Sequence, residues 1–293
     1  MDDLISITSG ALTARINPFG AELWSLQDAS GAQYMTDADP AFWTGHAPLL
    51  FPIVGGLVDD TYRLGDQTYH LPRHGFARRN AFDVLVVEED VAVFGLSDSA
   101  ETRKVYPFAF KLAMAFRLSG QTLHMAATIT NADDHPMPFS FGYHPAFAWP
   151  LPGGAAKDAH RIVFAKDEPE DIRRVDKALG QLLPEKQASP VKGRELALSP
   201  DLFEQDAVIW DHPHSHALSY GAEGGAWLDV SFPDTQALGL WQAPGAHFLC
   251  IEPWQGHADP LGFAGDFTQK PGVVTIEPGQ SRTYRLDVTV RPA

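Results

Sequence analysis

The 293-residue chain is predicted to be all-β: a large antiparallel β-sandwich with a few short helices. Apolar residues recur at every second position in several segments, and helical signals are few and short. The 25 glycines and 23 prolines are scattered along the chain and not gathered in a linker. A period of two is typical of half-buried strands, since successive side chains point to opposite faces. Scattered turn formers divide the chain into many short segments, as a sandwich requires.

The clearest alternation predicts a β-hairpin. Apolar residues occupy alternate positions in 112–118 and again in 123–129, and Ser119-Gly120 between them is typical of a tight turn. Two short strands at 83–87 and 91–96 are predicted to flank an acidic turn. Further strands are predicted at 226–232 and 284–290.

Helical signals are confined to two turns. Asp39 precedes Pro40 as a candidate N-cap, and Ser199 does the same before Pro200, which suits the first helical position. The stretch from 150 to 190 is the most irregular, and we expect it to run over the surface. We expect one domain over residues 1–293; a division near that stretch is the alternative.

Composition excludes several classes of function. The net charge of −15, with no basic run, disfavours nucleic acid and anionic membranes as partners. The sequence contains no stretch of 18 consecutive apolar residues, so no membrane-spanning helix is expected. The start of the sequence does not resemble a secretory signal. Cys250 is the only cysteine, which excludes an internal disulfide. We therefore expect a cytoplasmic protein, a monomer or weak dimer, that acts on a small molecule.

Three segments, 72–79, 139–147 and 248–254, combine a titratable group with turn formers and aromatics. Their titratable groups are His74, His144 and Glu252. Each follows an apolar run beside Gly or Pro, where a strand is expected to end and the group to project into a cleft. Histidine exchanges protons near neutral pH, and apolar neighbours raise the pKa of a glutamate.

Other residues of these segments are candidates for binding. An aromatic beside the carboxylate offers an apolar face to a sugar ring, which Trp254, Trp149 or Phe147 could supply. Taken singly, a histidine or arginine in a turn is more often structural or solvated than functional. A competing metal site would use His212, His214 and His216, although an exposed histidine-rich loop is favoured there. The sequence contains no phosphate-binding loop, serine nucleophile elbow or paired-cysteine zinc motif.

Six motifs in this order resemble the aldose 1-epimerase (galactose mutarotase-like) family, in its shorter bacterial LacX-like branch. They span nearly the whole chain and are specific in combination. They are Gly20-Ala21-Glu22-Leu23, Pro48 to Gly55, Arg73 to Arg78, Gly142 to Phe147, Cys250 to Trp254, and Lys270-Pro271-Gly272 followed by Pro278-Gly279.

The resemblance implies a large antiparallel β-sandwich that interconverts the α and β anomers of an aldose without a metal or organic cofactor. It implies that Glu252 is the general base at the C1 hydroxyl and that His144 is the general acid at the ring oxygen. His74 would support the ring oxygen. Candidate substrate-binding residues are Arg73, Arg78, Asp206, Trp254 and Phe147.

One position departs from the pattern. Gly56 stands where this branch often carries an arginine, which removes a fork of hydrogen-bond donors and weakens the expectation of phosphate binding. The alternatives are a hexose-6-phosphate 1-epimerase of the same fold, a non-catalytic carbohydrate-binding protein, and a metal-dependent sugar enzyme.

Overall fold

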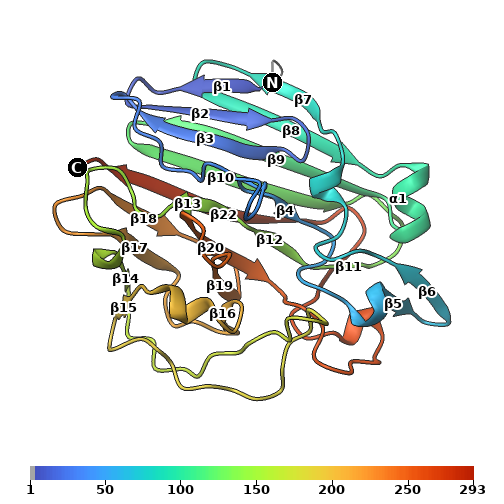
Figure 1. Ribbon diagram of the computed structural model, residues 1–293. Helices are drawn as coiled ribbons and strands as arrows, with labels where there is room; N and C mark the ends of the chain where they lie inside the picture. Colours follow the sequence, from blue (N-terminus) through green and yellow to red (C-terminus); the bar gives the residue numbers. More distant parts are fainter. Residues whose placement is uncertain (1–3) are drawn as a thin grey trace.

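A computed structural model describes residues 4–293, and it is dominated by antiparallel β-sheets (Figure 1). The largest sheet has nine strands and combines segments from before and after the irregular stretch of the chain. In sheet order, its strands are β15 (Glu195–Ala197), β14 (Arg161–Phe164), β17 (Ala217–Gly221), β18 (Trp227–Ser231), β22 (Ser281–Arg291), β10 (Thr122–Asn131), β9 (Phe110–Ser119), β8 (Val91–Ser97) and β7 (Asp83–Val87).

A six-stranded sheet carries the segments that matter most for function. Its strands are β16 (Val208–Trp210), β19 (Ala237–Trp241), β20 (Phe248–Gln255), β12 (Phe141–Tyr143) and β4 (Leu49–Leu50), with β13 (Ala146–Ala148) also paired to β20. A three-stranded sheet contains β1 (Ile5–Thr8), β2 (Leu12–Asn17) and β3 (Glu22–Asp28). The remaining pairs are β5 (Thr61–Leu64) with β6 (Gln67–His70), and β11 (Met137–Phe139) with β21 (Val274–Ile276).

The structure confirms the all-β prediction and the hairpin. β9 and β10 pair in antiparallel register, with Leu118 opposite Leu123 and Phe116 opposite Met125. Alternate residues of both strands are buried, as the period of two predicts. Gly120 takes a φ of +56° in the turn between them, a conformation that glycine adopts at little cost.

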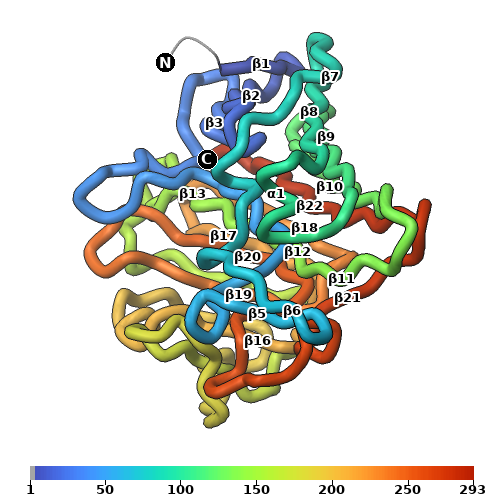
Figure 2. The backbone as a smooth tube through the Cα atoms, turned by 90° about the vertical axis from the view of Figure 1, so that its right-hand side faces the viewer, coloured from blue at the N-terminus to red at the C-terminus, as the bar shows by residue number. Residues whose placement is uncertain are grey.

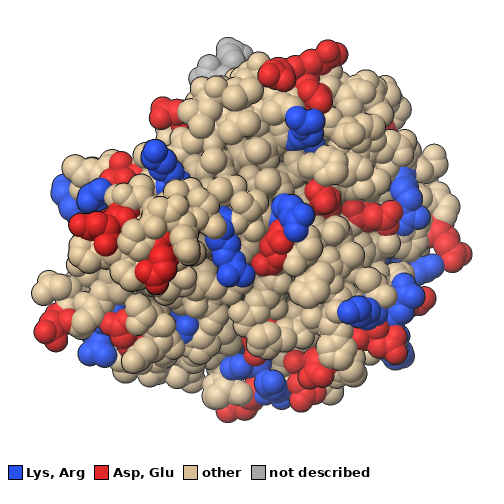
Figure 3. Space-filling model, turned by 180° about the vertical axis from the view of Figure 1, so that it is seen from behind, with Lys and Arg blue, Asp and Glu red and all other residues tan. Residues whose placement is uncertain are grey.

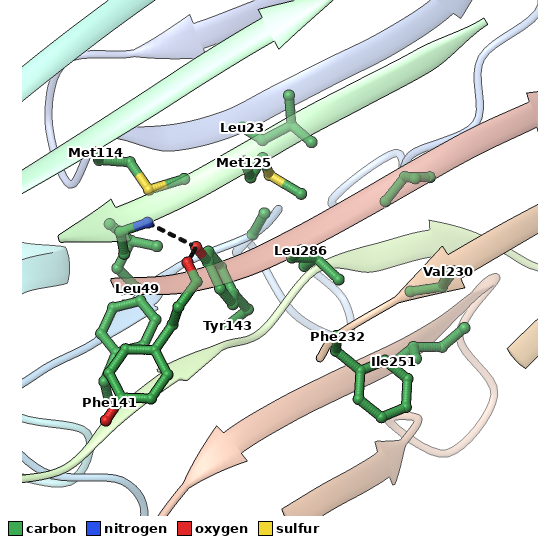
Figure 4. Packing of buried hydrophobic residues seen from close by; sticks show 14 of the residues in the cluster. Leu23, Leu49, Met114, Met125, Phe141, Tyr143, Val230, Phe232, Ile251 and Leu286 are labelled. Carbon is green, nitrogen blue, oxygen red and sulfur yellow. Dashed lines mark hydrogen bonds between the residues drawn. The ribbon is translucent and has the colours of Figure 1, made fainter. Parts of the chain in front are cut away.

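The main core lies between the nine-stranded sheet and the sheets that face it (Figures 2 and 4). Tyr143 of β12 connects the layers through its hydroxyl, which accepts a hydrogen bond from the Ala127 amide (3.0 Å) and donates one to the Tyr284 carbonyl (2.8 Å). A buried hydroxyl needs such partners, so these bonds fix the end of β12 relative to β10 and β22. The next residue along the chain is His144.

Helical structure is sparse, as predicted, but the positions and caps of the helices differ from the prediction. The turn at 39–43 is not a helix, although Asp39 accepts from the Ala41 amide (2.8 Å) as a cap would. Ser199 makes no side-chain cap before the second turn. The one α-helix of residues 4–293 was not predicted, because it is a single short turn that buries little apolar surface. The helices are α1 (Ala100–Val105), η1 (Val58–Asp60), η2 (Ala77–Arg79), η3 (Lys157–Ala159), η4 (Pro200–Phe203) and η5 (Phe267–Gln269).

The stretch from 150 to 190 is less irregular than expected at its start, because β14 joins the nine-stranded sheet there. From residue 165 it runs as a long loop below β16 in Figure 1. Glu168 anchors this loop: its fully buried carboxylate accepts the amides of His214 (2.8 Å) and Ser215 (2.5 Å). No helix among residues 4–293 is long and apolar enough to cross a bilayer.

Candidate active site

β-Sheet register brings His144 and Glu252 together. β12 and β13 both pair with β20, with Gly142 opposite Trp254 and Ala146 opposite Cys250. His144 lies between these pairs and is therefore level with Glu252, and side chains at directly opposed positions contact each other. His144 Nε2 lies 3.2 Å from Glu252 Oε2.

The expectation that Glu252 ends a strand is wrong. It lies inside β20, whose eight residues are all buried, because β12, β13 and β19 pair along this strand and the core covers it. Glu252 is only 1% exposed and His144 7% exposed. His144 does follow the end of β12, as predicted.

His74 lies in a tight turn between β6 and η2. It adopts a φ of +67° and donates its backbone N–H to the Gly55 carbonyl (2.9 Å). The Gly55 N–H in turn donates to His74 Nδ1 (3.1 Å), which assigns the hydrogen of the neutral ring to Nε2. Gly75 follows with a φ of +69°, and a Cβ there would collide with the Phe51 carbonyl oxygen. The Arg73-His74-Gly75 motif is thus set by backbone geometry.

Trp254 rests on glycines of both neighbouring strands. A Cβ at Gly142 of β12 would lie 2.6 Å from its indole, and one at Gly239 of β19 would lie 2.5 Å from it. Both distances are far below normal contact, so the two glycines leave the space in which the indole lies across the sheet.

Trp43 and Trp241 were not identified from the sequence. Trp43 stacks on the imidazole of His144, with ring centroids 4.9 Å apart, and meets Trp241 edge to face at 5.6 Å. The turn that begins at Asp39 places it there, through a bond from the Trp43 amide to the Asp39 carbonyl (3.1 Å). The sequence feature that accompanies Trp43 is Gly45, because glycine is the only residue type that leaves room there for the Trp43 indole.

These residues line one cavity of about 360 Å³, a size typical of small-molecule sites. Its wall contains buried polar atoms of His144, Glu252 and Trp254, and Nδ1 of His144 has no hydrogen-bond partner among residues 4–293. Buried polar atoms in folded proteins are nearly always satisfied, so this wall is suited to a ligand that brings hydroxyl groups. The lining comprises Trp43, Val54, Gly55, Gly56, Arg73, His74, Arg78, Arg79, His144, Val175, Gly180, Asp206, Ala207, Ile209, Trp241, Glu252, Trp254 and Ala258.

Burial shifts the titration of all three proposed proton-transfer groups toward the neutral form. It holds the pKa of Glu252 well above its usual range, and the nearby charge of Asp206 raises it further. Burial lowers the pKa of His144 to about 3, with a second contribution from Arg78. Burial, then the neighbouring His144, holds the pKa of His74 well below its usual value.

The arginines meet at one side of the pocket. Arg73 lies across Gly180, where any Cβ would collide with its guanidinium, and a Cβ at Gly56 would lie 3.7 Å from its Nε. Gly180 thus provides the space that the Arg73 side chain occupies, whereas a Cβ at Gly56 would make only an ordinary contact with it. Gly180 and Val175 belong to the loop after residue 165, so this loop forms part of the pocket wall.

Asp206 also lines the pocket and takes a φ of +67°. Its Oδ1 accepts the Ala207 amide (2.7 Å), and its carbonyl accepts from Arg174 Nη1 (3.0 Å). Burial lowers the pKa of Arg78, and the negative charge of Glu22 opposes this shift. The structure therefore brings together seven of the eight residues that the sequence selected.

Phe147 is the exception. Its side chain is fully buried in the main core and does not line the pocket, because β13 turns that face toward the nine-stranded sheet. Trp149 is likewise buried and donates to the Lys157 carbonyl (2.8 Å). His212, His214 and His216 are all exposed, and within 4–293 they form no cluster of metal-ligand atoms.

Comparisons with known proteins agree with this fold. A sequence model of the family described as Aldose 1-epimerase matches residues 3–275. The chain is 30% identical over 295 residues to the chromosomal protein LacX of Lactococcus lactis subsp. lactis, covering 98% of this chain and 99% of LacX.

Two solved structures are similar over nearly their whole length. A galactose mutarotase related enzyme from Lactobacillus acidophilus has a TM-score of 0.90 at 31% identity, covering 98% of this chain and 97% of that one. A galactose mutarotase-like protein from Lactobacillus casei has a TM-score of 0.91 at 30% identity, covering 98% and 100%. On this evidence of sequence and fold, the chain belongs to the aldose 1-epimerase family.

Proposed function

We propose that this protein is an aldose 1-epimerase that interconverts the α and β anomers of a hexose by opening and closing the ring. The observation that carries the proposal is the buried contact of 3.2 Å between His144 and Glu252 in the wall of an aromatic-lined cavity. Anomer exchange needs one group to accept the C1 hydroxyl proton and another to protonate the ring oxygen. A pair that shares one proton supplies both functions.

The pair holds that single proton in either of two arrangements. Burial favours a protonated Glu252 beside a neutral His144. Transfer of the proton to His144 gives a carboxylate and an imidazolium with no change in total charge. In this second form Glu252 removes the C1 hydroxyl proton while His144 protonates the ring oxygen, and closure reverses both steps. Each positioned group typically contributes about 10²–10⁴-fold to the rate.

His74 and Trp43 position the reacting atoms. Because Gly55 donates to Nδ1 of His74, the neutral imidazole presents Nε2–H as its donor, which suits an oxygen of the open-chain sugar. Trp43 stacks against the His144 imidazole and limits its rotation. Trp241 and Trp254 add apolar surface for the C–H face of the ring.

A phosphorylated hexose is the second candidate substrate. Arg73 and Arg79 line the pocket, and neither forms one of the arginine ion pairs found among residues 4–293. Positive charge concentrated here contrasts with the net charge of −15 and with the mixed charges on the face in Figure 3. A guanidinium fork suits a phosphate oxygen pair, and Arg73 occupies the space beside Gly56.

Polarimetry with freshly dissolved α-glucose, α-galactose and their 6-phosphates tests both candidates. An aldose 1-epimerase speeds the approach to anomeric equilibrium for at least one of them. Arg73→Gln should raise KM selectively for a phosphorylated sugar if the arginine side of the pocket holds the phosphate. Binding of sugars without any acceleration would instead favour a carbohydrate-binding protein.

A further inference from the structure

Beside the pocket wall, Cys250 supplies a third potential ligand atom that the proposed acid–base chemistry does not use. Cys250 and Glu252 are two residues apart on β20, so both side chains point to the same face of the strand, as does His144 opposite them. One ligand atom from each of these three residues lies within 4.8 Å of the other two. We propose that His144, Cys250 and Glu252 form an inhibitory site for a thiophilic divalent cation of the Zn²⁺ type.

The spacing fits such a cation. Zn²⁺ bonds of about 2.0–2.3 Å at tetrahedral angles place neighbouring ligand atoms about 3.3–3.8 Å apart. The Nε2 of His144 and Oε2 of Glu252 are already 3.2 Å apart, and the widest pair needs to close by about 1 Å at most. Imidazole, thiolate and carboxylate are all ligands that Zn²⁺ accepts, and His144 and Glu252 border a cavity from which water could supply a fourth.

Charge and burial support the same ion. A thiolate and a carboxylate together carry two negative charges, which a divalent cation neutralises in a region where unpaired charge is costly. Cys250 is fully buried and packs with Ala243, Ala246 and Phe248, beneath Trp43 and Trp241. Oε2 of Glu252 faces Nε2 of His144 in the pocket wall, so two of the three ligand atoms already lie side by side.

Binding releases any protons held by the thiol and the carboxyl to solvent and involves no redox change. The ion would occupy both groups of the proposed proton-transfer pair, so sugar turnover would stop. This inhibitory consequence rests on the proposed function, whereas the binding site itself does not.

Titration with Cd²⁺ tests the site directly, because Cys250 is the only cysteine of the chain. A Cd²⁺–thiolate absorption band in the ultraviolet can therefore come only from this residue. We expect the band to saturate at one Cd²⁺ per chain and to be displaced by Zn²⁺. Absence of the band at saturating Cd²⁺, in protein that is folded by circular dichroism, would overturn the proposal.

Two variants separate this site from other cation binding. Cys250→Ala should lose the band and bind Zn²⁺ at least about 10–100-fold more weakly in calorimetry. His135→Ala removes a ligand from the exposed Asp133-Asp134-His135 cluster and should leave the band unchanged. Inhibition by Zn²⁺ is measured against each variant's own metal-free rate.

The outcomes are distinguishable from failure of the proposed function. Equal Zn²⁺ sensitivity of wild type and Cys250→Ala would overturn the inhibitory site. A Cd²⁺ band in a protein that accelerates no anomer exchange would support the cation site while the epimerase proposal fails.

Discussion

Gly75→Ala is predicted to destabilise the protein by about 2–5 kcal/mol. Gly75 has a φ of +69°, and an L-residue pays about 1–2 kcal/mol for that conformation. The new Cβ would also collide with the Phe51 carbonyl oxygen, which accepts the amides of Phe76 (3.0 Å) and Ala77 (3.2 Å). Displacing that carbonyl weakens both hydrogen bonds, at about 0.5–1.5 kcal/mol each.

Gly120→Ala is the matched control. Gly120 has a φ of +56° in the hairpin between β9 and β10, but nothing lies within 4 Å of a Cβ placed there. This variant should lose only the conformational part, about 1–2 kcal/mol. Equilibrium denaturation in urea measures both, and the difference between them isolates the contact with Phe51. Equal losses in the two variants would refute the view that Gly75 is required for close packing and not only for its φ.

Three further predictions concern charged and titrating groups. Lys270→Met should cost about 3–5 kcal/mol in unfolding free energy, because it leaves Asp259 buried without the Lys270 Nζ that lies 2.9 Å away. Lys104→Met, which breaks an exposed ion pair with Glu101, should cost almost nothing. Similar losses in the two variants would contradict the view that burial makes the Lys270–Asp259 pair important. The background-corrected kcat/KM should be independent of pH from just above the His144 pKa of about 3 up to the raised pKa of Glu252. Above the Glu252 pKa it should fall, because the pair then loses its last proton. A change in kcat/KM centred near pH 6.5 would argue against this assignment. Because burial raises the Glu252 pKa, the folded protein binds that proton more tightly than the unfolded chain, and the resulting stability is lost as pH rises from 4.5 through the folded pKa. Glu252→Gln should therefore be more stable than wild type above that range, with a difference in unfolding free energy that closes toward pH 4.5. A difference independent of pH would contradict the burial effect.

Local patterns predicted the strands, and the pocket residues were selected by local patterns together with the family resemblance. The hairpin of β9 and β10 follows from alternation and a turn signal, both of which are encoded within 20 residues. His74 was selected because a titratable group stands beside a turn former, and the structure gives both His74 and Gly75 a positive φ in that turn. These features depend on short-range geometry, which a sequence displays directly.

Features that depend on long-range pairing were not predictable from the sequence. Glu252 was placed at a strand end because Pro253 follows it, yet pairing with three neighbouring strands extends β20 to residue 255. Phe147 was assigned to the pocket, although the face of β13 that it occupies is set by register with β20. Trp43 joins the site from a turn about 100 residues before His144, and no local pattern connects them.

The most direct test of the central claim is polarimetry of α-glucose and α-galactose with wild type, Glu252→Gln and the surface variant Glu101→Gln. Glutamine keeps the shape of the carboxylate but can neither accept nor deliver the proton that the pair exchanges. We predict acceleration by wild type and by Glu101→Gln, and a rate near background for a folded Glu252→Gln protein. Full activity of Glu252→Gln would contradict the role assigned to the His144–Glu252 pair.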